Sequence, residues 1–341
     1  MPTDLLGLLG SSMPVIAAPM AGGPTTPALV LAASQAGSAG FLAGGYKTAD
    51  ELATQVAEVR GQVGTYGVNL FAPNQVFVDP AEYAAYRELL LPLAERYGVD
   101  LPVQPVEDDD GWQDKVDVLV EAAPPVVSFT FGLPDPAGAA ALRRAGCALV
   151  QTVTSPEEAR LAVEAGMDGL AVQSAHAGGH WGTFTPERVP ARVVLSDLVS
   201  AVVAAVDLPV LAAGGVGSAA DVDAALEAGA QAVGVGTLLL LAHEAGTNPA
   251  HRAGLSAADH GPTVTTRAFS GRPAGALRNG FLAAYDDQAP LGYPALHYLT
   301  SPIRRAAAAV ADLDNVNLWA GSGYRSAEER PAGEILRSLV A

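Results

Sequence analysis

The chain has 341 residues, half of them hydrophobic, which is enough for one large core with a smaller unit attached and argues against a disordered chain. The formal net charge is −17 and basic clusters are few, so neither nucleic acid nor an anionic membrane is expected as a partner. The one cysteine, Cys147, excludes an internal disulfide, and we expect the protein in a reducing cytoplasm. Apolar runs such as 232–242 are too short and too rich in glycine for a membrane span of about 20 residues.

Short apolar segments, each followed by a helix signal, repeat along the chain. Residues 15–20 form the first apolar run, and Thr26-Pro27 then opens a helix with a capping residue followed by proline. Ser155 and Ser218 begin later helices, each three residues before an acid. The predicted strands are 15–20, 40–43, 68–71, 126–131, 148–153, 170–172, 210–213 and 232–235.

A repeated helix ending makes the fold class specific. Four helices end in Ala-Gly shortly before an apolar strand, and their glycines are Gly37, Gly146, Gly166 and Gly229. Repeated βα units of this kind force parallel strands joined by right-handed crossovers. Eight such strands favour a closed TIM (β/α)8 barrel over an open sheet.

The regions outside this repeat divide the chain into three parts. We assign 1–243 to the barrel, with an excursion at 73–125 between the third and fourth strands. Residues 244–313 contain prolines, glycines and helical segments, and we expect a smaller, mainly helical domain inserted after the eighth strand. Residues 314–341 are expected to return to the barrel.

The excursion itself contains an amphipathic helix near 80–97 and an acidic turn at 107–110. We expect the acids to be solvated, because no histidine and no series of spaced ligands accompanies them. His176 and His180 are four residues apart, but the glycines between them disfavour a helix that would align them. No metal site is therefore expected.

The stretch 169–184 is the expected centre of the chemistry. An apolar strand ends in Gln173 and Ser174, and Gly178-Gly179 then remove Cβ atoms just before His180, so that a flat ligand can approach the main chain. Residues at the C-terminal ends of barrel strands are usually functional. The alternative is that the histidines lie on a surface loop and the glycines only make turns.

Two neighbouring strands also end in glycine-rich turns, at Gly214-Gly215 and at Gly236-Thr237. Backbone N–H groups from such turns and from the next helix can hold a phosphate without lysine, and barrels commonly bind phosphate after strands seven and eight. The alternative is that the glycines only permit tight turns. The three arginines that follow, Arg267, Arg272 and Arg278, are candidates either to bind substrate anions or to be solvated.

These residues together resemble the nitronate monooxygenases, formerly called 2-nitropropane dioxygenases. The resemblance covers most of the chain and rests on the segments 18–23, 67–71, 127–132, 173–182, 212–216 and 234–237. It implies a TIM barrel with non-covalent FMN that oxidises alkyl nitronates, and also nitroalkanes, with O2 to a carbonyl compound and nitrite. Departures are Ser174-Ala175-His176, where many relatives carry a small residue and an acid, and Gly321-Ser322 in place of Gly-Gln.

The resemblance also implies roles for single residues. His180 would be the catalytic base, since an imidazole with an unperturbed pKa of about 6.5 is largely neutral at pH 7 and can accept a proton from carbon. Ser128, Phe131 and His176 are the expected substrate contacts. The residues expected to bind FMN are Met20, Ala21, Gly22, Asn69, Gln173, Gly178, Gly179, Gly214, Gly215, Gly236, Thr237, Gly321 and Ser322.

Two other functions use the same residues. FMN-dependent enoyl-acyl-carrier-protein reductases and NADH:quinone reductases share the barrel and the Gly-Gly-His loop, so the site would then oxidise a nicotinamide. A redox-free barrel that binds a sugar phosphate or nucleotide would use the same glycines, with His180 as acid and base. FMN is favoured over a dinucleotide because no G-x-G-x-x-G follows the first strand. We expect a monomer or homodimer.

Overall fold

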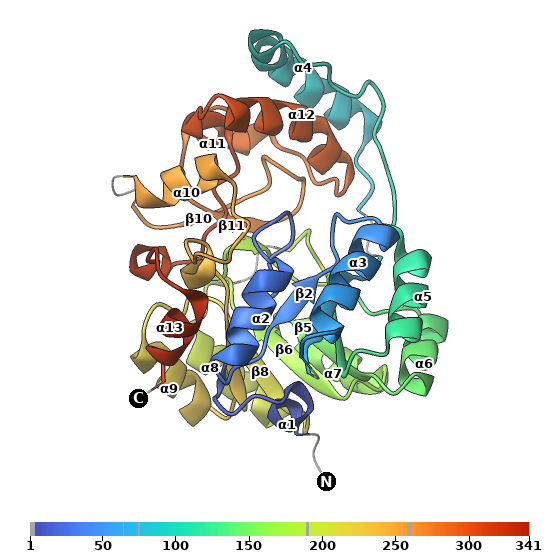
Figure 1. The fold of residues 1–341 in the computed structure, drawn as a ribbon. Helices are drawn as coiled ribbons and strands as arrows, with labels where there is room; N and C mark the ends of the chain where they lie inside the picture. The colour runs from blue at the N-terminus through green and yellow to red at the C-terminus, as the bar shows by residue number, and fades with distance from the viewer. Residues whose placement is uncertain (1–3, 64, 74–75, 189–190, 258–260, 341) are drawn as a thin grey trace.

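Eight parallel strands surrounded by helices form the body of the protein in the computed structural model, which describes residues 4–63, 65–73, 76–188, 191–257 and 261–340 (Figure 1). The barrel strands are β1 (Val15–Ala17), β2 (Phe41–Ala43), β3 (Gly67–Phe71), β4 (Val126–Thr130), β5 (Ala148–Val153), β6 (Gly169–Gln173), β8 (Val210–Ala213) and β9 (Ala232–Val235). The first nine helices are α1 (Leu5–Leu9), α2 (Pro27–Gln35), α3 (Ala49–Arg60), α4 (Pro80–Tyr97), α5 (Trp112–Ala122), α6 (Pro136–Arg144), α7 (Pro156–Glu164), α8 (Leu195–Ala205) and α9 (Ala219–Glu227).

The barrel is closed between its first two strands. The strand order is β1-β9-β8-β6-β5-β4-β3-β2, and every neighbouring pair is parallel. A parallel bridge between Ala17 and Gly40 joins the two ends, where the Ala17 N–H donates to Ala39 O at 2.8 Å. The predicted eight-stranded parallel barrel is confirmed.

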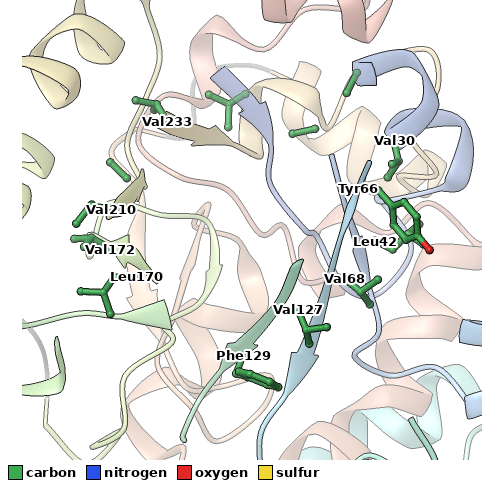
Figure 2. Packing of buried hydrophobic residues seen from close by; sticks show 14 of the residues in the cluster. Val30, Leu42, Tyr66, Val68, Val127, Phe129, Leu170, Val172, Val210 and Val233 are labelled. Atoms are coloured by element: carbon green, nitrogen blue, oxygen red, sulfur yellow. The ribbon is translucent and has the colours of Figure 1, made fainter. Parts of the chain in front are cut away.

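Alternation along the strands decides what faces the barrel interior. On β4, Val127 and Phe129 pack in the layer between strands and helices, and Figure 2 shows Val127 beside Val68 of β3. The intervening residues face inward, from Val126 in an apolar plug that includes Leu5 of α1 to Ser128 near the other end of the strand. The interior is therefore apolar at the N-terminal ends of the strands and polar at their C-terminal ends.

The same alternation places the residues of β6 on two sides. Leu170 and Val172 belong to the strand–helix layer, whereas Ala171 and Gln173 line the interior cavity. Ala171 is the inward residue that packs on the apolar cluster at the N-terminal end of the barrel. Its last residue is the polar one that faces the cavity.

A second unit lies across the C-terminal ends of the strands, opposite α1 (Figure 1). Its small sheet has the order β10-β11-β7 and is antiparallel, so the unit is not built of helices alone. The excursion contributes α4, which packs on α12 and shares a hydrophobic cluster with residues 264–303. The elements are β7 (Gly179–His180), α10 (Pro249–Ser256), β10 (Val264–Thr266), β11 (Ala274–Ala276), α11 (Gly280–Tyr285) and α12 (Ala295–Ala309).

The last helix, α13 (Ala332–Arg337), packs against α2 and β1, on the outside of the barrel (Figure 1). It covers the layer that a helix directly after β9 would otherwise cover. Four short 3₁₀ turns complete the described chain, at Thr237–Leu239, Asp286–Gln288, Leu313–Asn315 and Tyr324–Ser326.

The acidic turn is partly buried, contrary to our expectation that its carboxylates are solvated. Asp110 accepts the N–H of Tyr46 at 2.9 Å and forms an ion pair of 2.7 Å with Lys115, whose side chain is only 2% exposed. Asp108 accepts a hydrogen bond from the Tyr298 hydroxyl of α12. The turn therefore joins the barrel to the second unit.

Replacement of Lys115 by methionine should destabilise the protein by about 3–5 kcal/mol, because it leaves the Asp110 carboxylate buried without its charged partner. Urea unfolding of Lys115→Met and of Lys115→Met/Asp110→Asn measures this, and the double variant should regain most of the loss. The exposed pair of Arg160 and Glu157 provides the control, since Arg160→Met should cost less than about 1 kcal/mol. Equal losses at Lys115 and Arg160 would contradict the structural role of the buried pair.

Candidate active site

A cavity of about 510 Å³ opens at the C-terminal ends of the barrel strands, beneath the second unit. This volume is in the range of small-molecule and cofactor sites. The predicted site residues that line it are Met20, Ala21, Gly22, Asn69, Ser128, Phe131, Gln173, Gly178, Gly179, His180, Gly214, Gly215, Gly236, Thr237 and Gly321. Ser322 and His176 are not among the lining residues.

His180 is held in the cavity by the small antiparallel sheet. It pairs with Ala274 of β11, and the following residue, Trp181, donates its N–H to Pro273 O at 3.0 Å. The Gln173 amide fixes the same loop, because its Nε2 donates to His180 O at 3.2 Å and its Oε1 accepts the Gly182 N–H at 2.7 Å. The side chain that we assigned to the flavin therefore also positions the histidine loop.

The His180 imidazole contacts one hydroxyl and three aromatic rings. Its Nε2 lies 2.7 Å from Ser270 Oγ, and Ser270 Oγ can donate to Arg272 O at 3.3 Å. When the Ser270 hydroxyl donates to that carbonyl, it can only accept a hydrogen bond from Nε2, so Nε2 carries a proton. Nδ1 is then the ring nitrogen that can accept a proton. The rings around the imidazole have centroids at 5.7 Å for Phe131, 5.5 Å for Tyr293 and 5.5 Å for Trp319.

This environment keeps the imidazole neutral. Burial, with Arg272 and Arg304 adding to it, lowers the pKa of His180 to about 3. Our expectation of an ordinary histidine pKa was therefore wrong, because desolvation penalises the imidazolium and no carboxylate offsets that penalty. Burial likewise lowers the pKa of His297 and lowers that of His251 to about 4.

The charged side chains in the cavity wall are all cationic. Arg304 and Arg305 line the cavity, and no aspartate, glutamate or lysine does so among the described residues. Arg304 donates to neutral oxygens, namely Thr300 Oγ1 at 3.0 Å, Asn317 Oδ1 at 3.2 Å and His297 O at 2.9 Å. Burial lowers the pKa of Arg304 to about 10, so it stays charged at neutral pH. In a chain of net charge −17, this wall suits an anionic ligand.

Several lining residues were not predicted from the sequence. Thr130 and Thr152 lie inward on β4 and β5, and the period-two alternation of these strands is a signal that identifies them. Tyr46 and His297 stack with centroids 4.3 Å apart and an interplanar angle of 5°. His297 comes from the second unit, which no sequence pattern places over the barrel.

The glycines of the cavity wall have different reasons to be glycine. Gly179 has φ +72°, and a Cβ there would meet nothing within 4 Å, so its surroundings leave room for a bound group. Gly215 has φ +87°, and a Cβ there would lie 2.8 Å from His176 Cβ. Gly236 has φ −116°, an ordinary conformation, and a Cβ there would lie 3.4 Å from Met20 Sδ.

The C-terminal return completes the wall. Thr237 Oγ1 accepts the Gly321 N–H at 2.9 Å, and the Ser322 N–H donates to His176 O at 3.0 Å. The His176 ring itself turns to Arg192, with Nδ1 at 3.3 Å from the guanidinium. His176 and His180 therefore do not form a pair, although they are four residues apart.

The described ranges contain no group of three or more His, Cys, Asp or Glu side chains that could hold a metal ion. No helix in the described part of the chain is both long and apolar enough to cross a membrane.

Comparisons with known proteins agree with this geometry. Residues 4–341 match the family model described as nitronate monooxygenase. The chain is 38% identical over 344 residues to a nitronate monooxygenase of Pseudomonas aeruginosa, covering 98% of this chain and 97% of that protein. It is 35% identical over 330 residues to a probable nitronate monooxygenase of Bacillus subtilis, covering 96% and 94%.

Solved structures are similar as well. A nitroalkane oxidase from Streptomyces ansochromogenes superposes with a TM-score of 0.91 and 40% identity, over 98% of this chain and 96% of that one. FabK from Thermotoga maritima superposes with a TM-score of 0.75 and 25% identity, over 99% and 95%. On the family match and the full-length relatives, this chain belongs to the nitronate monooxygenases, a family of flavin-dependent enzymes.

Proposed function

We propose that this protein oxidises alkyl nitronates with O2 to a carbonyl compound and nitrite, with FMN as its flavin. The observation that carries the proposal is the cationic cavity, in which Arg304 and Arg305 face a neutral His180 with no carboxylate among the described lining residues. A nitronate is an anion, and such a wall attracts it at neutral pH. When bound, the flavin supplies the oxidation of the nitronate and the reaction with O2.

The cavity fits a mononucleotide. The expected phosphate site is formed by the turns after β8 and β9, where Gly214 and Gly215 have positive φ and Thr237 begins a 3₁₀ turn. Backbone N–H groups there can hold a phosphate without a cation. Met20, which follows β1 beside β9, and Asn69, on β3, would lie along the flavin, so that the ring system also contacts strands other than those whose turns bind the phosphate.

The protein would act on neutral nitroalkanes more weakly than on their nitronates, because only the nitroalkane needs His180 as a base. A nitroalkane must first lose a proton from carbon, and His180 is the side chain that would accept it. With its pKa lowered to about 3, the imidazole is unprotonated at neutral pH, but the uptake of a proton in this buried site is unfavourable in free energy. A nitronate needs no such step, so we expect it to be the better substrate.

The first test is nitrite release from a small nitronate by the purified protein. A visible spectrum and mass spectrometry of the released cofactor should identify FMN, and a dinucleotide would overturn that part of the proposal. Rapid anaerobic reduction of the flavin by NADH or NADPH without nitrite formation would instead favour the reductase alternative. A protein that takes up no flavin would favour a redox-free barrel.

Replacement of His180 by asparagine should lower the turnover of a neutral nitroalkane by about 10²- to 10⁴-fold and that of the preformed nitronate much less, because only the first substrate needs a base. Steady-state kinetics on both substrates measure this, with FMN content checked in parallel. His176→Asn is the control, since His176 lies outside the cavity lining. If only His176→Asn loses activity on the nitroalkane, the base is assigned to the wrong histidine.

Replacement of Gly179 by alanine should lower FMN affinity by about tenfold, because the new Cβ would occupy space that the flavin needs. Gly146→Ala is a matched control: Gly146 also has positive φ and an unobstructed Cβ position, but it ends α6, far from the cavity. Both variants carry a similar backbone strain of about 1 kcal/mol. Titration of the apoproteins with FMN separates the two effects, and equal FMN affinity in both variants would remove Gly179 from the flavin site.

The free energy of unfolding should fall as the pH drops from about 6.5 to 5. In this range the histidines of the unfolded chain bind protons, whereas the buried histidines of the folded protein stay neutral. His251 shows this clearly: its Nε2 donates to Trp319 O at 2.9 Å, and burial lowers its pKa to about 4. His251→Gln should flatten the fall by about 1.4 kcal/mol per pH unit in urea unfolding. The exposed His243, replaced in the same way, is the control for the loss of a surface histidine. Parallel slopes for all three proteins would show that His251 is protonated when folded.

A further inference from the structure

Arg272 is a buried cation that the proposed reaction leaves unexplained. Its side chain is 0% exposed, so the alternative that this arginine is solvated is wrong. The guanidinium lies 4.1 Å from the ring centroid of Phe131, and its Nη2 donates to the carbonyl oxygens of Phe131, at 3.3 Å, and of Thr183. Its Nε and Nη1 have no hydrogen-bond partner within the described chain.

No carboxylate touches this guanidinium in the described structure. Glu158 and Glu187 are the acids whose charges act on Arg272 from a distance. Glu158 accepts the Thr183 hydroxyl at 2.7 Å and the Phe184 N–H at 2.7 Å, so that Thr183 stands between the two charges. Burial lowers the pKa of Arg272 to about 10, and it remains charged at neutral pH. A buried charge without an ion-pair partner lowers the stability of the fold, and an uncharged side chain of similar length would avoid that loss.

The Arg272 guanidinium and the His180 imidazole both contact the Phe131 ring, which forms the cavity wall beside His180. Phe131 lies between them, with its ring perpendicular to the imidazole at a centroid distance of 5.7 Å. The other titratable or charged groups that face His180 are Tyr293, His297 and Arg304, and all are neutral or cationic at neutral pH. A positive field that solvent does not screen therefore acts on whatever lies between the imidazole and the flavin site.

We infer that Arg272 is a positioning residue that acts through the Phe131 wall, where its fixed positive charge opposes a second positive charge on His180 and makes the cavity select an anionic nitronate over the neutral nitroalkane. The selection of a nitronate rests on the proposed function, whereas the effect on His180 rests on the geometry alone. Arg304 adds to the same field from the cavity wall, but it is placed to touch a ligand, whereas Arg272 is not among the lining residues.

The test compares Arg272→Met, which keeps an unbranched side chain against Phe131, with Arg272→Lys, which keeps the charge. Nuclear magnetic resonance of histidine-labelled holoprotein, with the His180 signal assigned through His180→Asn, gives its protonation directly. In Arg272→Met the His180 pKa should rise by about one unit or more, and the KM for the nitronate should rise by about tenfold while kcat/KM for the nitroalkane does not fall. Arg272→Lys should stay near the wild type in all three quantities.

The controls separate this role from folding and from the proposed reaction. Arg325→Met removes an exposed arginine that stacks on Tyr324 at 4.8 Å, and it should change none of these quantities. If Arg272→Met does not fold, Arg272→Gln, which is uncharged and polar, takes its place in the same measurements. A wild-type His180 signal that titrates near pH 6.5 would also overturn the inference. A folded Arg272→Met with unchanged His180 titration and nitronate KM would also overturn it. Absence of nitrite formation by the wild type would instead reject the proposed function and leave the effect on His180 standing.

Discussion

The antiparallel pairing of β7 with β11 is the contact on which the site depends. The loop after β6 leaves the barrel, and two residues of it, Gly179 and His180, become the edge strand of a sheet in the second unit. Main-chain hydrogen bonds of this kind are directional, so the position of His180 is set by the second unit and not by the barrel alone. Gln173 supplies the matching restraint from the barrel side. The cavity is therefore a property of the interface between the two units.

The electrostatics of that interface follow from burial without compensation. The chain carries many more acids than bases, yet the charged groups around His180 are arginines. Hydrogen bonds to carbonyl and hydroxyl oxygens satisfy part of each guanidinium without neutralising it. The result is a site that accepts anions by its field and keeps its histidines neutral by desolvation. Both properties suit the oxidation of a nitronate, which arrives already deprotonated.

Asp110 and Arg272 are charged residues whose surroundings differ from what their polar segments indicate. The acidic turn had the composition of a solvated loop, but Asp110 accepts the N–H of Tyr46 and Asp108 accepts the hydroxyl of Tyr298, and both tyrosines lie far from the turn in the chain. Arg272 stood in a polar segment and is completely buried. In both cases the partner is supplied by another element, and composition within a short window carries no information about that partner.

The sequence by itself determined the repeated βα units, the eight strands, and the residues at their C-terminal ends, because helix caps, glycine stops and apolar runs are local signals. It also placed His180 and the glycine turns on one edge, since parallel strands end on the same side of a barrel. Only the tertiary structure decided that Tyr46, His297 and Arg304 complete the cavity and that His176 does not line it. It also decided that the pKa of His180 is lowered far below its ordinary value. These features depend on packing between distant segments and on the desolvation that packing produces, neither of which has a local signature in the chain.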